Sequence, residues 1–571
     1  MDSSIMNNLV NKEIDKIYNL VHQKQFNFAE KTAHLILKRD PNNSRIFDLI
    51  GDIHNAQNQQ MQSIWYYYSS LDRKFNNKTL YKLGTNIYYL GKYDEAEKIL
   101  NSVIENDPTF ISAYLTMGQI HEENDKIEDA IMCYEAIIDI EPKELAAYLN
   151  LALLYKKNKN FSEAVKVYQK ASISLPSNHY ILSNLGNLFY LQHKYEDAII
   201  CHQRAIKIKS DSNIVYFNYA NTLINAQQFD DAIKMYNKSI ELNSNFTRAH
   251  INLGTALLTK ERFEEGFQEY EYRIHEDPLL VDLIKSEKPI WKGEDISGKT
   301  IVVSCESGFG NTIQFSRYLE TLQQLNCKII FRCPEQVQHL FEELEFIEQI
   351  VNIEEHLDDY DFWVPLQNLI YILTPDLKNY CPAPTQIKVN DAKIQEWETL
   401  MGVDNMVKIG LHWQGSKQNP RDQQNSLELF HYKNIIENKK ASFISLQKGN
   451  AQSQIEKYNF SKEIINYDPL IDTGSKKFID TAAIIKYLDL VITTDNAIAH
   501  LAGSLGTQTW LLLPHVSDWR WFSSNEETIW YENFRIYRQQ KPGDWTDVVN
   551  KVKIDLDILI DNIHEVRNPK A

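Results

Sequence analysis

A repeat of 34 residues is the feature that most constrains how the first half of this 571-residue chain can fold. Turn residues Pro108, Pro142 and Pro176 recur at this spacing. Two small-residue positions and one bulky position keep the same register: Gly84, Gly118, Ala152, Gly186, Ala220 and Gly254; Ala96, Ala130, Ala164, Ala198, Ala232 and Gly266; Tyr134, Tyr168, His202, Tyr236 and Tyr270. Small residues permit close approach of two helices and a bulky residue fills the gap beside them, so each unit is predicted to be a helix pair.

These units resemble the tetratricopeptide repeat. Extending the register back through Pro41, Gly51 and Ala29 gives about eight helix pairs over residues 1–274. Stacked pairs present a long concave surface. We therefore expect the array to hold a protein or peptide partner, the alternative being that it only supports the C-terminal half. Polar residues recur on the first helices and suit either a peptide-binding face or a solvated surface: His121, Asn150, Asn184, Asn187, Asn218, Asn221 and Asn252.

The second half alternates short apolar runs with amphipathic stretches, which is typical of a parallel sheet covered by helices. Predicted strands lie at residues 301–304, 328–332, 347–351, 407–411, 443–446, 490–492 and 510–513. We expect a linker at 275–297, an N-terminal lobe at 298–395 and a C-terminal lobe at 396–571. A cleft between two such lobes is a usual place for a ligand.

Composition narrows the class of protein. The formal net charge of −17 argues against nucleic acid as a general partner. Six scattered cysteines without a CxxC pair argue against zinc and against a disulfide framework. There is no apolar N-terminal segment and no apolar run of about 18 residues, so neither a signal peptide nor a transmembrane segment is expected. A cytoplasmic location is predicted.

The stretch 488–522 is the strongest candidate for a binding site. It reads as strand, loop, helix and strand, so a helix N-terminus lies beside the end of a buried strand, next to Asp495. The backbone N–H groups of Asn496, Ala497 and Ile498 are predicted to receive a diphosphate, because the helix dipole favours an anion there. His500 follows on the first turn and either donates to a phosphate oxygen or packs inside the helix layer.

Other polar residues follow the ends of neighbouring predicted strands. Gly415 permits a close backbone approach, and Lys417 and Lys448 offer positive charge, although Lys448 also fits a plain surface lysine. In the N-terminal lobe, Gly308 and Gly310 form a glycine-rich turn at a strand-to-helix junction. The candidate ligand-binding residues are Gly308, Gly310, His412, Gln414, Gly415, Lys417, Gln447, Lys448, Asp495, Asn496 and His500.

An ordered set of motifs in the C-terminal half is similar to the glycosyltransferase-like domain attached to bacterial tetratricopeptide proteins. That family is related to the heptosyltransferases and has a GT-B fold, so the resemblance implies two Rossmann-like lobes, with the acceptor on the first and a nucleotide-sugar on the second. No cofactor and no metal are expected, since Asp359 and Asp361 fit a solvated strand start better than a metal motif. The matching segments are Trp291–Lys299, Glu306–Tyr318, Ser445–Gly449, Asp480–Ala482, Leu488–Phe522, Trp530–Tyr531, Arg538–Gln539 and Gly543–Trp545.

The chain departs from the family pattern at three places that face the expected ligand. Asn311 stands where the family has an aspartate, the candidate base, and an amide cannot act as a general base. Asn496 stands where the family has threonine, and residues 421–426 lack the expected Arg-Ser pair. Glu306 is the nearby carboxylate that either replaces the missing base or accepts hydrogen bonds from loop amides.

These observations leave three functions open. The first is an inverting glycosyltransferase that moves a sugar from a nucleotide-sugar to a protein or glycan presented by the repeats, with Glu306 and Asn311 at the catalytic positions. The second is a non-catalytic scaffold with a vestigial GT-B domain, which the three departures favour. A chaperone-like adaptor needs the repeats alone and leaves the C-terminal motifs unexplained.

Overall fold

The computed structural model describes residues 3–306, 308–375, 377, 380–402, 404–415, 425–523 and 526–567, with side chains from residue 11 onward. The chain divides into two compact units, Met1–Ser210 and Asp211–Ala571. Each unit is described by itself.

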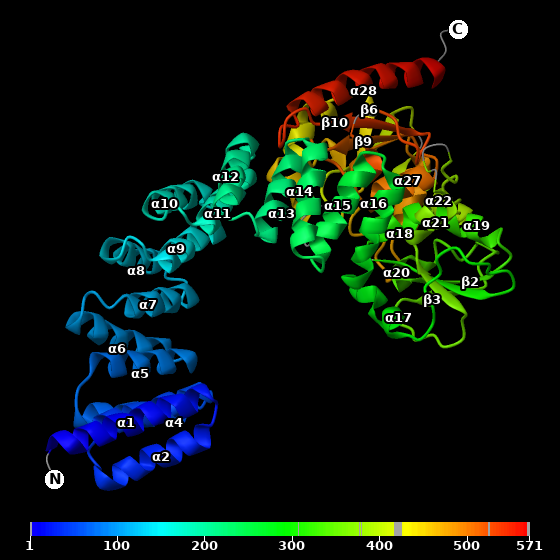
Figure 1. The fold of residues 1–571 in the computed structure, drawn as a ribbon. Coiled ribbons are helices and arrows are strands. Elements are labelled where there is room, and N and C mark those ends of the chain that lie inside the picture. Colours follow the sequence, from blue (N-terminus) through cyan, green and yellow to red (C-terminus); the bar gives the residue numbers. More distant parts are fainter. Residues whose placement is uncertain are drawn as a thin grey trace. The chain divides into compact units, whose positions relative to one another are not determined.

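The described residues of the first unit form six helix pairs (Figure 1). Asparagine side chains cap several first helices: Asn76, for example, accepts hydrogen bonds from the N–H groups of Lys78 and Thr79 and so satisfies donors that have no partner inside the helix. The helices are α1 (Ser3–His22), α2 (Phe26–Arg39), α3 (Ser44–Ala56), α4 (Gln60–Arg73), α5 (Asn77–Tyr89), α6 (Tyr93–Asn106), α7 (Ile111–Glu123), α8 (Ile127–Ile140), α9 (Leu145–Lys157), α10 (Phe161–Ser174), α11 (His179–Leu191) and α12 (Tyr195–Ile208).

The predicted contact between a small and a bulky residue is confirmed in two helix pairs of the first unit. A Cβ atom added to Gly118 would lie 2.6 Å from Cε1 of Tyr134, and one added to Gly186 would lie 2.8 Å from Cε1 of His202. Both distances are shorter than a van der Waals contact. Glycine is therefore required at these positions because the bulky ring of the second helix lies directly on the backbone of the first.

His202 gives the first unit a predicted pH dependence. Burial lowers the pKa of His202 to about 4, whereas an unfolded histidine titrates near 6.5. The unfolded chain binds the proton more tightly, so stability contributed by the neutral ring is present above about pH 6.5 and is lost as the pH falls towards 4. The loss is about 2 kcal/mol at pH 5.

Neighbouring repeats have tyrosine at this position, so His202→Tyr should remove that part of the pH dependence. Urea unfolding of both proteins at pH 7 and pH 5 measures it, and an equal fall in stability in the two would contradict the expectation.

The second unit begins with two further helix pairs, α13 (Asn213–Asn225), α14 (Phe229–Leu242), α15 (Thr247–Thr259) and α16 (Phe263–Tyr270). Here Asn221 accepts hydrogen bonds from the hydroxyl of Tyr236 at 2.6 Å and from the side chain of Asn252 at 2.9 Å. These two asparagines of the predicted polar row therefore join neighbouring repeats to each other. The segment that follows contains η1 (Glu271–His275), η2 (Pro278–Leu280) and α17 (Val281–Lys285).

Two parallel sheets with helices form the rest of the second unit, as expected for an α/β region (Figure 1). The first has the order β3-β2-β1-β4 and the second β10-β9-β8-β5-β6-β7. The strands are β1 (Thr300–Ser304), β2 (Lys328–Cys333), β3 (Gln349–Asn352), β4 (Phe362–Pro365), β5 (Val407–His412), β6 (Ala441–Ser445), β7 (Ile464–Ile465), β8 (Leu490–Thr494), β9 (Thr509–Leu513) and β10 (Phe534–Arg538).

Helices cover these sheets and complete their apolar cores. The long helix α28 (Thr546–Arg567) buries Val552, Leu556 and Ile560 in the same cluster as Val407 and Ile409 of β5. The helices are α18 (Phe309–Phe315), α19 (Arg317–Gln323), α20 (Glu335–Gln338), α21 (Asn368–Leu373), α22 (Asp391–Met401), η3 (Leu429–Tyr432), α24 (Lys433–Ile436), η4 (Gly449–Gln452), α25 (Ser453–Lys457), α26 (Ile479–Tyr487), α27 (Ala497–Ser504), η5 (Trp519–Trp521) and α28 (Thr546–Arg567).

The last repeats pack onto the α/β region within this unit. The ring of Phe267 in α16 meets Trp519 edge-on at 5.7 Å, and Gln227 donates a hydrogen bond to the carbonyl of His515 at 3.0 Å. The compact unit therefore begins at Asp211, inside the repeat array, whereas the sequence suggests a boundary near residue 274. The predicted domain limits stay a prediction.

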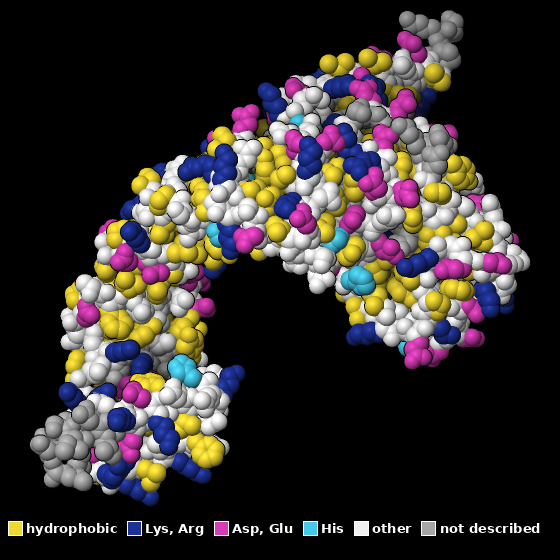
Figure 2. All heavy atoms as spheres, in the orientation of Figure 1, with side chains coloured by type: hydrophobic (Ala, Val, Ile, Leu, Met, Phe, Trp, Pro, Cys, Tyr) yellow, Lys and Arg dark blue, Asp and Glu magenta, His cyan; other side chains and the backbone are white. Residues whose placement is uncertain are grey.

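One face of the molecule shows how charged side chains are distributed on it. On the face shown in Figure 2, the acidic and basic side chains of the described residues are interspersed. This pattern differs from the basic stripe typical of nucleic-acid-binding proteins. None of the helices in the described part of the chain is long and apolar enough to span a membrane.

Candidate functional site

A cavity of about 850 Å³ in the second unit is lined by residues that follow strands of both sheets. In the second sheet, β5 and β8 are neighbours, and the chain proceeds from them in opposite directions, to β6 and β7 on one side and to β9 and β10 on the other. The carboxyl ends of strands at such a switch point are where open parallel sheets bind ligands. The cavity is lined by Gly308, Phe309, Gly310, Asn311, His412, Gln414, Gly415, Asn425, Leu446, Gln447, Lys448, Asp472, Lys477, Phe478, Thr481, Asp495, Asn496, Ala497, Ile498, His500 and Arg520.

The N-terminus of α27 forms part of the cavity wall, as the stretch 488–522 suggests. Asn496 is its N-cap, and the side-chain oxygen of Asn496 accepts a hydrogen bond from the N–H of Ile498 at 2.9 Å. One of the three backbone donors predicted for a diphosphate is therefore already used. The N–H groups of Asn496 and Ala497 remain the candidates for an anion at this helix end.

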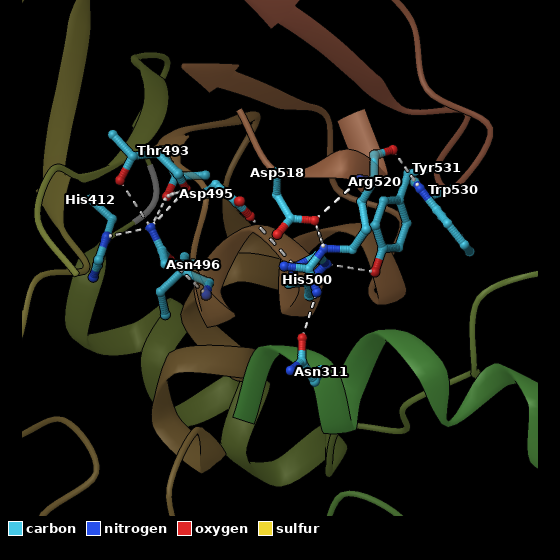
Figure 3. Close-up of polar contacts among 12 residues, drawn as sticks. Asn311, His412, Thr493, Asp495, Asn496, His500, Asp518, Arg520, Trp530 and Tyr531 are labelled. Atoms are coloured by element: carbon cyan, nitrogen blue, oxygen red, sulfur yellow. Dashed lines mark hydrogen bonds and ion pairs between the residues drawn. The ribbon is translucent and has the colours of Figure 1, made fainter. Parts of the chain in front are cut away.

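His500 lies on the first turn of α27, 2% exposed, where it lines the cavity (Figure 3). Its Nδ1 is 3.2 Å from the hydroxyl of Tyr531, its Nε2 is 3.8 Å from a carboxylate oxygen of Asp495, and its ring stacks on Trp521. Burial, with the charges of Arg520 and Arg317, lowers the pKa of His500 well below its ordinary value. The imidazole is therefore neutral near pH 7 and offers a ligand a hydrogen bond without a charge. The position of His500 fits both interpretations given above, in which the ring packs inside the helix layer or donates to a phosphate oxygen.

Arg520 is one of the cavity residues that reasoning from the sequence missed. Its guanidinium forms an ion pair with Asp518, Nε to Oδ1 at 3.0 Å, and donates a hydrogen bond from Nη1 to the side-chain oxygen of Asn311 at 2.5 Å (Figure 3). Asn311 lies in α18, which follows β1 of the first sheet, and Arg520 lies in η5, which follows β9 of the second sheet. This hydrogen bond therefore joins the regions of the two sheets at the cavity. An aspartate at position 311 would add a third negative charge beside Arg520, after those of Asp518 and Asp495, whereas asparagine adds none.

Burial opposes the charge of Arg520, but Asp518 and Asp495 overcome it and raise its pKa. The guanidinium therefore stays charged. The sequence signal for this residue was the segment Asp518–Trp521, where the arginine stands between two tryptophans and an aspartate precedes them. That segment supports the family resemblance, but nothing in its spacing indicated that Arg520 reaches the first lobe.

Gln447 and Lys448, two of the predicted ligand-binding residues, line the cavity, but both side chains already have partners in the protein. The side-chain oxygen of Gln447 accepts hydrogen bonds from the N–H groups of Trp413 and Gln414, at 3.2 and 2.9 Å, and thereby ties the end of β6 to the end of β5. Lys448 forms an ion pair with Asp468 at 2.5 Å. The charge of Lys448 is therefore largely compensated, and its main part in the site is to hold the wall in place.

A loop before α26 contributes wall residues that show no sequence pattern. Asp472 accepts hydrogen bonds from the N–H of Asp480 at 2.8 Å and from the hydroxyl of Thr481 at 2.5 Å. These bonds satisfy donors at the start of α26. Lys477 and Phe478 on the same loop complete this side of the cavity and bring a further cation to it.

Glu306, one of the two candidate catalytic residues, is not among the residues that line the cavity, and its catalytic role stays a prediction. Its side chain is 3% exposed, pairs with Nε of Arg273 at 2.7 Å and accepts a hydrogen bond from the N–H of Gln367 at 3.0 Å. The carboxylate thus joins the last repeat to the first sheet, the structural alternative considered above. Lys417 and residues 421–424 lie outside the described residues.

Comparisons with known proteins agree with the repeat array. Tetratricopeptide repeat family models match residues 89–154, 145–172 and 218–279. This chain carries tetratricopeptide repeats. The predicted repeat family is thereby confirmed for the N-terminal part, and this finding makes a protein or peptide the expected class of partner for the repeats.

The curated Protein FlbA of Caulobacter vibrioides is 23% identical over 308 residues, which cover 50% of this chain and 50% of that protein. The chain thus spans about half the length of this relative. A tetratricopeptide repeat protein from Parabacteroides merdae aligns with 45% of this chain and 98% of its own at 16% identity, with a TM-score of 0.31. A thermophilic TPR protein from Thermus thermophilus aligns with 32% and 100% at 18% identity, with a TM-score of 0.25.

Proposed function

We propose that the α/β region is a GT-B glycosyltransferase domain that takes a sugar from a nucleotide-sugar and transfers it to an acceptor, a protein or glycan presented by the repeats. The observation that carries this proposal is the cavity at the carboxyl ends of β5 and β8. Ten of the eleven candidate ligand-binding residues are described and all of these line that cavity. The Rossmann-like strand orders of the two sheets also support it.

The diphosphate of the donor would lie at the start of α27. There the N–H of Ala497, the helix dipole and the guanidinium of Arg520 offer favourable charge, and the neutral imidazole of His500 offers a hydrogen bond. These groups stabilise the negative charge that grows on the leaving nucleotide as its bond to the sugar breaks. Cationic side chains and backbone N–H groups of the chain thus stabilise the negative charge that a metal ion stabilises in other transferases.

In an inverting transfer the acceptor oxygen attacks the anomeric carbon from the face opposite the nucleotide, and a base removes the acceptor proton. Asn311, which stands at the position of the family's base, is an amide hydrogen-bonded to Arg520 and cannot take a proton at neutral pH. Glu306 is held by Arg273 away from the cavity. These two contacts favour a second candidate function, a repeat scaffold whose α/β domain binds a nucleotide without transferring a sugar.

A thermal-shift screen with UDP, GDP, ADP, CMP and their sugars tests binding first. A ligand at 100 times its dissociation constant stabilises the folded state by about 2.7 kcal/mol, so a saturating ligand should raise the melting temperature by a few degrees. If none of these compounds shifts the transition, nucleotide binding is wrong. Mass spectrometry of a candidate acceptor incubated with the binding sugar nucleotide then separates the two functions, because only the transferase adds the mass of a sugar.

A further inference from the structure

Asn496 has a single possible orientation in this structure. Its side-chain oxygen accepts the hydrogen bond from the N–H of Ile498 at 2.9 Å, and its side-chain nitrogen donates to the carbonyl of Thr494 at 2.7 Å. A backbone N–H cannot accept and a carbonyl cannot donate, so exchanging the oxygen and the nitrogen would break both bonds. The amide group of Asn496 therefore points towards β5.

The same amide nitrogen lies 3.1 Å from Nδ1 of His412, the last residue of β5 (Figure 3). The second hydrogen of this nitrogen also faces Oγ1 of Thr493 at 3.0 Å and Oγ1 of Thr494 at 3.2 Å. Because an amide NH2 group cannot accept, a proton on Nδ1 of His412 would point at this group without forming a bond, so Nδ1 is an acceptor and carries no proton. The proton of the neutral ring is then on Nε2. His412 lines the cavity. Its Nε2 has no hydrogen-bond partner among the described residues, and it is not one of the fully buried polar atoms that lack a partner there.

We infer that Asn496 is a positioning residue that holds His412 in the Nε2-protonated tautomer, so that His412 donates a hydrogen bond to an anionic oxygen of the ligand. The inference rests on the proposed function, because the ligand is the diphosphate part of a nucleotide or nucleotide-sugar. It gives a role to an amide that departs from the family pattern. The side chain of Asn496 thus caps α27 and also determines which ring nitrogen of His412 carries the proton.

The surroundings of His412 keep it a neutral donor. Burial lowers the pKa of His412 to about 4, so the ring carries no charge near pH 7. A neutral ring needs a partner to select one of its two tautomers, and that partner is the amide of Asn496. The Nε2–H group of His412 is thus a second hydrogen-bond donor, beside the N–H of Ala497, at the place proposed for the diphosphate.

The tautomer is tested by nitrogen NMR of the imidazole in the unliganded full chain, with the signals of His412 assigned by their loss in His412→Gln. We expect the proton on Nε2. In Asn496→Asp the carboxylate still caps α27, since aspartate is as good an N-cap as asparagine, but it accepts from His412 and moves the proton to Nδ1. A proton on Nδ1 in the unmodified protein would overturn the inference, as would an unchanged tautomer in Asn496→Asp.

Binding of inorganic pyrophosphate tests the donor. The side-chain nitrogen of glutamine can reach the place of Nε2, whereas that of asparagine reaches only the place of Nδ1. We expect His412→Asn to bind pyrophosphate about ten-fold or more weakly, the effect of losing one hydrogen bond to a charged group, and His412→Gln to stay within about three-fold of the unmodified protein.

Equal affinity in the unmodified protein and in His412→Asn would overturn the donor role while the proposed function stands. An unmodified protein that binds neither pyrophosphate nor any nucleotide would overturn the proposed function and the donor role together. Circular dichroism of each variant confirms that the fold is intact, so a loss of binding is assigned to the site.

Discussion

Glu306→Gln is expected to lower the free energy of unfolding of the second unit by about 3–5 kcal/mol. Glu306 and Arg273 form a buried ion pair in which Arg273 also donates to the side chain of Asn368 at 2.7 Å. Removing the negative charge leaves the guanidinium of Arg273 buried without its counter-charge. This pair joins η1 to the loop after β1, so its loss loosens the junction between the last repeat and the first sheet.

Urea unfolding of the full chain measures this change. Glu320→Gln serves as the matched control, because Glu320 lies exposed in α19 of the same lobe, and it should change stability by less than about 0.5 kcal/mol. Combining Glu306→Gln with Arg273→Met removes both charges and should recover part of the lost stability. A Glu306→Gln protein that is fully stable but no longer transfers sugar would instead show that Glu306 is the base.

Arg520→Gln is expected to weaken nucleotide binding about 100-fold. Each hydrogen bond to a charged group contributes about 1.5–3 kcal/mol, and the substitution also leaves the buried carboxylate of Asp518 without its cation. The negative charge of Asp518, no longer balanced by the guanidinium, would repel the phosphates of the ligand. Both effects lower affinity, and together they make Arg520 the most sensitive of the cavity residues.

Calorimetric titration with the nucleotide that gives the largest thermal shift measures this effect. Arg520→Lys keeps the charge but loses the planar fork that reaches both Asp518 and Asn311, so an intermediate loss is expected. Arg535→Gln is the control, because Arg535 forms its ion pair with Asp555 away from the cavity. Unchanged affinity in Arg520→Gln would remove the guanidinium from the proposed site.

The repeat array was readable from the sequence because its constraint is local and periodic. Gly118 and Tyr134 lie 16 positions apart in one helix pair, and the same spacing recurs with Gly186 and His202. Each contact is repeated along the chain, so a single sequence displays it several times. The junction with the α/β region, by contrast, depends on single contacts such as that of Phe267 with Trp519, which no periodicity announces.

The cavity wall could be predicted where residues lie at a strand end or directly after it, as His412 and Asp495 do. The state of each side chain could not be predicted, because it depends on partners distant in the sequence. Lys448 is neutralised by Asp468, and Asn311 meets Arg520 from the other lobe. The order of the strands, which makes β5 and β8 neighbours, is likewise a property of pairing rather than of local pattern.

The claim that the α/β region binds a nucleotide at the start of α27 is tested most directly by calorimetric titration of the unmodified chain with UDP, GDP, ADP and CMP in turn. We expect one of them to bind at one site per chain and pyrophosphate to compete with it. An absence of binding heat for all four at several temperatures would contradict the claim.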